Sequence, residues 1–168
     1  QLLAIAIALT LGISFLCSLM EALILSTTIA EIEGLKRSQP ARGERLERLK
    51  VNIEETISTI LTLNTIANTL GSVIIGGLAT KLYGQAALGI VSAILTFGIL
   101  IFSEVVPKTL GVVYRRSLQP YIAHPLTWMC NTLRPVTYVC SLIVRAFIGT
   151  PKQEAHSDQE IILLAQRG

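Results

Sequence analysis

The residues best suited to chemistry in this sequence are oxygen ligands inside long apolar segments. Glu104 follows a stretch, Leu82–Ser103, that contains no charged residue and is long enough to cross a bilayer at about 20 residues per span. A charge at membrane depth costs at least about 2.5–3.5 kcal/mol and is kept mainly where it has a function. Pro107 removes one helical hydrogen bond and should displace the carbonyl of Ser103. A carboxylate beside a free carbonyl is suited to a hard cation.

Polar side chains in two other apolar segments are spaced to complete such a site. One segment carries a polar stripe at helical steps, and another carries two asparagines one turn apart. At a rise of 1.5 Å per residue, a residue from each segment comes to a similar height near the bilayer midplane, roughly 12–18 Å from the inner end of its span. The polar residues are Thr10, Ser14, Ser18 and Glu21 in the stripe, then Asn64 and Asn68.

Structural explanations compete with this interpretation. Serine, threonine and glycine are ordinary packing residues between membrane helices. Glu104 precedes Lys108 by four residues, so the two could form an ion pair that has only a structural role. If a cation does bind, carboxylate, amide, hydroxyl and carbonyl oxygens suit Mg²⁺, Ca²⁺ or Na⁺ and do not distinguish among them.

The elements that must position these residues are predicted to be membrane helices. The chain is 51% hydrophobic and 15% charged, whereas a soluble domain carries about 25% charged residues. Three apolar runs, Leu2–Ala30, Ile57–Thr80 and Gln85–Gly111, are each long enough to span as a helix. Lysine and arginine are concentrated in the connection Glu31–Glu55, which places the N-terminus outside and the C-terminus in the cytoplasm. The predicted fold is an all-α membrane protein.

The domain organisation follows from these runs. Residues 1–113 should form a three-helix transmembrane domain, whose cytoplasmic connection at 31–55 includes a short amphipathic helix at Arg42–Asn52. Residues 114–150 should form a belt of interfacial helices, interrupted at prolines. Residues 151–168 read as a linker and the first helix leading to a further domain. We expect no disulfide, no enzymatic activity and no nucleic-acid binding.

Within the belt at residues 114–150, the helices are expected to be interrupted at Pro120, His124 and Pro125. Aromatic side chains of the belt should lie near the lipid headgroups, and these are Tyr121, Trp128 and Tyr138.

Three stretches resemble motifs of the CorC/CNNM (cyclin M-type) magnesium transporter family. Ser18-Leu19-Met20-Glu21 resembles the family's Ser-x-x-Glu motif, and the stretch from Thr59 to Asn68 resembles its t-i-L-x-x-N-T-x-x-N signature. The stretch from Ser103 to Lys108 is similar to its Glu-x-x-Pro-Lys motif. The tail at 157–168 resembles the helix that leads into the family's cytosolic CBS domains.

The resemblance implies a homodimer in the cell (inner) membrane that transports Mg²⁺, by efflux coupled to Na⁺. It implies that the family-matched residues bind the metal. Ser103 is added to this set because Pro107 should displace its carbonyl oxygen. Glu21 is expected to shape the ion path or to carry Na⁺. The alternative function is a membrane anchor and sensor that holds a structural divalent cation; a membrane-damaging protein is disfavoured, because lysis needs no polar stripe at matched depth. The family-matched residues are Ser18, Asn64, Thr65, Asn68 and Glu104.

Overall fold

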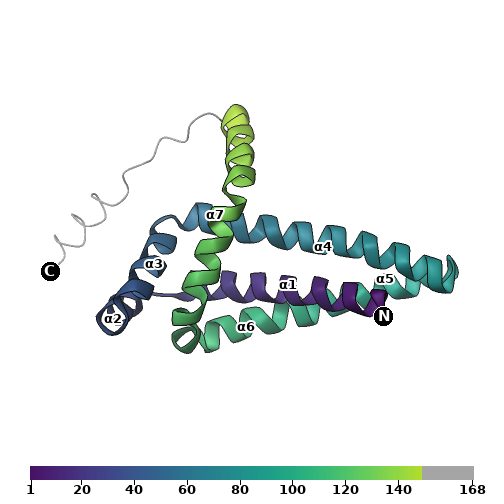
Figure 1. Ribbon diagram of the computed structural model, residues 1–168, viewed down its shortest axis with the longest axis horizontal. Helices are drawn as coiled ribbons and strands as arrows, with labels where there is room; N and C mark the ends of the chain where they lie inside the picture. The colour runs from purple at the N-terminus through teal and green to yellow at the C-terminus, as the bar shows by residue number, and fades with distance from the viewer. Residues whose placement is uncertain (149–168) are drawn as a thin grey trace, which may run out of the picture. The chain divides into compact units, whose positions relative to one another are not determined.

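The computed structural model describes residues 1–148, which are helical apart from short connections (Figure 1). The predicted linker and terminal helix at 151–168 lie outside the described residues. Residues 1–137 form one compact unit, and the description below concerns that unit unless stated otherwise. The elements are α1 (Leu2–Ser26), α2 (Ile29–Ser38), α3 (Pro40–Val51), α4 (Ile53–Tyr83), α5 (Ala86–Gly98), the π-helix η1 (Ile99–Val105), α6 (Val106–Val113) and α7 (Arg115–Ile148).

Three helical segments within the described part of the chain are long and apolar enough to cross a membrane. They are Leu2–Ser26, Ile53–Tyr83 and Leu88–Val113. The third is built from α5, η1 and α6 in series. The predicted all-α fold with three candidate spans is confirmed.

The first span ends earlier than the apolar run suggests. Helix α1 stops at Ser26 rather than continuing to Ala30, because Thr27 adopts an extended conformation. Thr28 then starts α2 with a capping box: its hydroxyl accepts from the Glu31 N–H at 3.3 Å, and its own N–H donates to the Glu31 carboxylate at 3.1 Å. Reciprocal capping of this kind satisfies two donors that a helix start leaves unpaired, so the run divides into two helices.

Helix α1 packs between α4 and α6, and the three run side by side (Figure 1). Gly71 of α4 lies so close to Thr10 that a Cβ at that glycine would collide with the threonine side chain. On the other side, a Cβ at Gly111 of α6 would lie 2.7 Å from the Leu19 carbonyl oxygen. Small residues at these two positions therefore permit close approach, as is usual between membrane helices.

The buried apolar side chains gather where α1 ends and α4 begins, which we call the connection end of the bundle. Helices α2, α3 and the first part of α7 contribute to this cluster, so the predicted amphipathic helix is confirmed as α3, with its two leucines buried. The cluster comprises Cys17, Met20, Leu23, Ile24, Ile32, Leu35, Leu46, Leu49, Ile60, Ile122, Ala123, Leu126 and Met129.

Helix α7 is continuous, and the predicted interruptions are wrong. A proline leaves the carbonyl four residues earlier without its helical partner. Here those carbonyls belong to three residues that are all exposed, so solvent can hydrogen-bond to them. The prolines are Pro120, Pro125 and Pro135, and the carbonyls belong to Arg116, Tyr121 and Asn131.

Two aromatic side chains lie on the outer face of α7. Tyr121 and Trp128 lie seven residues apart and are 71% and 67% exposed, while Ile122 and Met129 beside them are buried.

Candidate cation site

A hydrogen-bonded group of polar side chains joins α1 to α4. The Ser14 hydroxyl donates to Asn64 Oδ1 at 2.7 Å, and Asn68 Nδ2 donates to the same oxygen at 3.3 Å. Ser14 is fully buried. It was not among the predicted ligands, although its place in the polar stripe of the first span was the signal that could have found it.

Two buried oxygen atoms in this region have no hydrogen-bond partner among the described residues. They are Ser18 Oγ and Asn68 Oδ1. Leaving a buried polar atom unsatisfied costs about 1–3 kcal/mol. An orphaned polar atom in a folded protein needs an explanation, and an ion is one of the usual ones. Ser18 lies one helical turn, about 6 Å, beyond Ser14 along α1.

The third span reaches this region through its π-helix. The Ser103 hydroxyl in η1 donates to the Leu11 carbonyl of α1 at 3.1 Å, and Glu104 follows it, partly exposed. Pro107 does not break the helix. The chain instead widens its turns before the proline, and the Val106 N–H bonds to the Ile101 carbonyl five residues earlier. The expected break is thus replaced by a π-helix, a feature that recurs at functional sites.

Lys108 pairs with a carboxylate of another helix and not with Glu104, the partner in the competing structural explanation. Its Nζ lies 3.4 Å from Glu21 Oε2 on α1, and the close packing at Gly111 brings the two helices within reach. The side chain of Glu21 is 15% exposed and that of Lys108 is 47% exposed. The structural alternative for Glu104, an ion pair with Lys108, is therefore not the pair that forms. Within residues 1–148, no ion pair involves Glu104.

The contacts show how the predicted ligands lie along α1. Asn64 is level with Ser14, and Ser103 is level with Leu11, so the polar groups of α4 and η1 meet α1 within about one turn of each other. Ser18 lies one turn nearer the connection end, with Glu21 a further turn beyond it. Thr65 is exposed on α4, and its assignment as a ligand stays a prediction that rests on the family resemblance.

A second charged cluster, outside the spans, joins α2 to α7. The Glu31 carboxylate accepts from Arg115 Nε at 3.1 Å, from Arg116 Nε at 3.0 Å and from Gln119 Nε2 at 3.2 Å. Burial acts to raise the pKa of Glu31, but hydrogen bonds from Arg116, the Thr28 N–H and Arg115 outweigh it and lower the pKa to about 2. This carboxylate is already neutralised by two guanidinium groups, so its role is to fasten α7 to α2.

The polar cluster between α1, α4 and η1 has the chemistry of a hard-cation site. No group of three or more His, Cys, Asp or Glu side chains capable of holding a metal occurs in the described part of the chain. The available donors are amide, hydroxyl and carbonyl oxygens with one carboxylate. Such donors suit Mg²⁺, Ca²⁺ or Na⁺ rather than zinc or copper.

Three candidate membrane spans define this chain as a helical membrane protein. A family model described as the cyclin M transmembrane N-terminal domain matches residues 4–168, and the chain belongs to that family. The family assignment suggested by the three motifs is confirmed.

Relatives with this domain occur in bacteria and in plants. The chain is 32% identical over 155 residues to the UPF0053 protein sll1254 of Synechocystis, covering 92% of this chain and 45% of that protein. It is 30% identical over 107 residues to the UPF0053 inner membrane protein YfjD of Escherichia coli, covering 61% of this chain and 24% of that protein. A chloroplastic DUF21 domain-containing protein of Arabidopsis thaliana is 24% identical over 166 residues, 96% of this chain and 25% of that protein. The chain thus spans less than half the length of these relatives.

Proposed function

We propose that this chain is the membrane domain of a Mg²⁺ transporter. The observation that carries the proposal is the pair of buried, unpartnered oxygens, Ser18 Oγ and Asn68 Oδ1, in the same bundle as a carboxylate, Glu104, that no described ion pair neutralises. A cation bound between these oxygens, directly or through its water ligands, would supply them with a partner and the carboxylate with a counter-charge. The polar atoms would then be satisfied only when the cargo is present.

The proposed ligands are the side-chain oxygens of Ser18, Asn64, Asn68 and Glu104, together with backbone oxygen near Ser103. Mg²⁺ is chosen as the cargo because the ligand types suit a hard cation and the motifs match the magnesium transporter family. Mg²⁺ prefers octahedral coordination and gives up water reluctantly, so several waters can complete its shell. An intramembrane site beside irregular helix is the common arrangement in secondary transporters.

We propose efflux coupled to Na⁺, with Glu21 serving the coupling ion. Its carboxylate is held by Lys108 at 3.4 Å and lies two turns from Ser14 along α1, so release of the lysine would expose a second negative charge on the same path. A three-helix unit is small for an ion path that must open to each side in turn, so we propose a homodimer. The charge pattern supports an N-terminus outside and cytosolic CBS domains on the C-terminal side. The E. coli relative is named an inner membrane protein, which supports the same location for this chain.

The decisive measurement is Mg²⁺ titration of purified variants. Glu104→Ala should abolish binding, because it removes the only negative charge among the proposed ligands. Asn68→Ala should weaken binding severely, and Ser18→Ala less so where water can replace the hydroxyl. Thr96→Ala is the control, since the Thr96 hydroxyl donates only to its own helix at Ser92. A folded Glu104→Ala protein with unchanged Mg²⁺ affinity would remove the site.

Flux measurement separates the transporter from the anchor and sensor. Liposomes that contain the protein should release Mg²⁺ faster when a Na⁺ gradient is imposed, and Glu104→Ala should stop this release. Normal Mg²⁺ binding without flux, with or without Na⁺, would instead support a structural cation in a sensor.

A further inference from the structure

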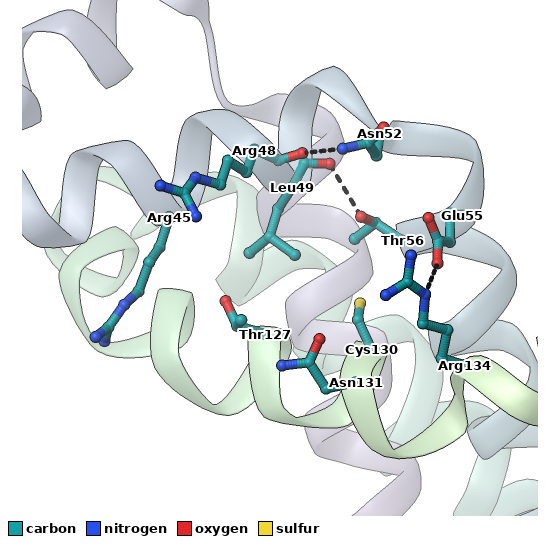
Figure 2. A pocket seen from close by; sticks show the side chains of 10 residues that line it. All are labelled: Arg45, Arg48, Leu49, Asn52, Glu55, Thr56, Thr127, Cys130, Asn131 and Arg134. Carbon is teal, nitrogen blue, oxygen red and sulfur yellow. Dashed lines mark hydrogen bonds and ion pairs between the residues drawn. The ribbon is translucent and has the colours of Figure 1, made fainter.

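A pocket of about 410 Å³ lies at the connection end of the bundle, apart from the candidate cation site. Figure 2 shows it bounded by α3, the first turn of α4 and the first part of α7. Its volume falls within the range of about 300–1,000 Å³ that is usual for small-molecule sites. It is lined by Arg45, Arg48, Leu49, Asn52, Glu55, Thr56, Thr127, Cys130, Asn131 and Arg134.

The lining carries three guanidinium groups and one carboxylate, so its net charge is positive. The carboxylate is Glu55, and its Oε1 lies 3.9 Å from Arg134 Nε, which is the long limit for an ion pair. Arg45 Nη1 lies 3.2 Å from His124 Nδ1, a contact that brings no negative charge. Within residues 1–148, no ion pair therefore balances the positive charge of Arg45 and Arg48.

The wall of this pocket is held in place by its own hydrogen bonds. Asn52 Nδ2 donates to the Arg48 carbonyl at 3.0 Å, and the Thr56 hydroxyl donates to the Leu49 carbonyl at 3.0 Å (Figure 2). These bonds fix the corner between α3 and α4. The arginine backbones are thus positioned before any ligand binds, which lowers the entropic cost of binding.

The pocket adjoins the start of a candidate membrane span, so we expect it at the level where a bilayer meets water. Its lining includes the first turn of α4, and that candidate span begins at Ile53. Beside the lining residue Thr127, Trp128 is 67% exposed, and beside Asn52, Val51 is 76% exposed. An exposed tryptophan next to arginines at the end of a span is typical of the headgroup region.

We propose that this pocket binds the phosphate group of an acidic phospholipid headgroup. Arginine forms paired, charge-assisted hydrogen bonds to phosphate oxygens, and basic pockets at the inner ends of membrane helices bind anionic headgroups. The Asn131 amide lies on the α7 wall, where it can donate to the same group, whereas the Thr127 hydroxyl beside it already donates to the Ala123 carbonyl at 2.6 Å. The exposed Val51 and Trp128 side chains give the glycerol and acyl portions an apolar surface next to the pocket.

The test is native mass spectrometry of the purified protein after reconstitution with phosphatidylcholine and increasing amounts of phosphatidylglycerol. The wild type should retain phosphatidylglycerol in preference to phosphatidylcholine. Arg45→Gln with Arg48→Gln should weaken that retention about 10- to 100-fold, from the usual contribution of charged hydrogen bonds. The matched control is Arg37→Gln with Arg42→Gln, which removes the same charge from exposed residues of the same connection that do not line the pocket.

Two further arms make the result decisive. Asn131→Asp adds a carboxylate of nearly the same shape to the pocket wall and should reduce retention even if the double arginine variant folds poorly. Inorganic phosphate, added without phosphatidylglycerol, should not raise the melting temperature as the lipid does. Equal loss in the pocket and control variants, or retention of phosphatidylcholine equal to that of phosphatidylglycerol, would overturn the proposal. Stabilisation by inorganic phosphate alone would overturn the assignment to a lipid.

Discussion

Replacing Gly111 with alanine tests the contact that sets the spacing of α6 and α1. A Cβ there would lie 2.7 Å from the Leu19 carbonyl oxygen, 3.1 Å from Ala22 Cβ and 3.2 Å from the Leu23 nitrogen. None of these atoms can rotate away, so α6 must move off α1. Overpacking costs about 1–3 kcal/mol. Alanine recovers up to about 1 kcal/mol in helix propensity. We expect a net loss of about 0–2 kcal/mol in the free energy of unfolding.

The same substitution at Gly12 is the matched control. No heavy atom lies within 4 Å of a Cβ built at Gly12, so only the propensity gain applies there and the variant should be slightly more stable. Reversible unfolding in one detergent would compare the two variants directly. Mg²⁺ affinity should fall with Gly111→Ala, because the shift of α6 carries Glu104 with it. The reasoning would be refuted if Gly111→Ala proved as stable as Gly12→Ala.

Three further perturbations test contacts outside and within the spans. Because the pKa of Glu31 is lowered from 4.5 to about 2, its stabilising effect is complete above pH 4.5 and is lost as the pH falls toward 2. Unfolding measured across that window should show a loss of about 1 kcal/mol that Glu31→Gln lacks, because solvent around the exposed Arg116 screens the interaction. Lys50 Nζ donates to the Ile24 carbonyl at 2.9 Å at the end of α1, so Lys50→Met should cost about 1–3 kcal/mol; equal melting temperatures would count against this cap. Ser14→Ala removes the 2.7 Å bond to Asn64 and should cost about 1 kcal/mol in denaturant unfolding, whereas an unchanged midpoint would show that water replaces the hydroxyl.

The spans could be predicted from the sequence because bilayer thickness alone sets their length. Their ends could not be read from hydropathy. Thr27 and Thr28 are uncharged and pass unnoticed within an apolar run, although Thr28 and Glu31 have the spacing of a capping box. Capping is decided by backbone geometry at single residues, and average hydropathy carries no such information.

The partner of Lys108 could not be predicted either. Spacing along the chain suggested Glu104, but the ion pair forms across two helices with Glu21, at a position set by the packing of Gly111. The polar stripe of α1 did indicate which helix face meets α4. It could not indicate that Ser14, rather than Ser18, donates to Asn64, because the register between two helices depends on close contacts far apart in sequence.

The buried apolar cluster has a mechanical consequence for the bundle. Its α1 members run from Cys17 to Ile24, whereas nearer the start of α1 the buried contacts are polar, at Thr10 and Ser14. One end of the bundle is therefore clamped by apolar side chains from five helices, whereas the other end has fewer buried apolar side chains, among them Ile75 and Ala79 of α4. Amide hydrogen exchange should be slowest around Leu23 and faster toward Leu2. Any rocking of one span against another would then pivot at the clamped end, with a displacement that grows along the spans toward Leu2 and Tyr83.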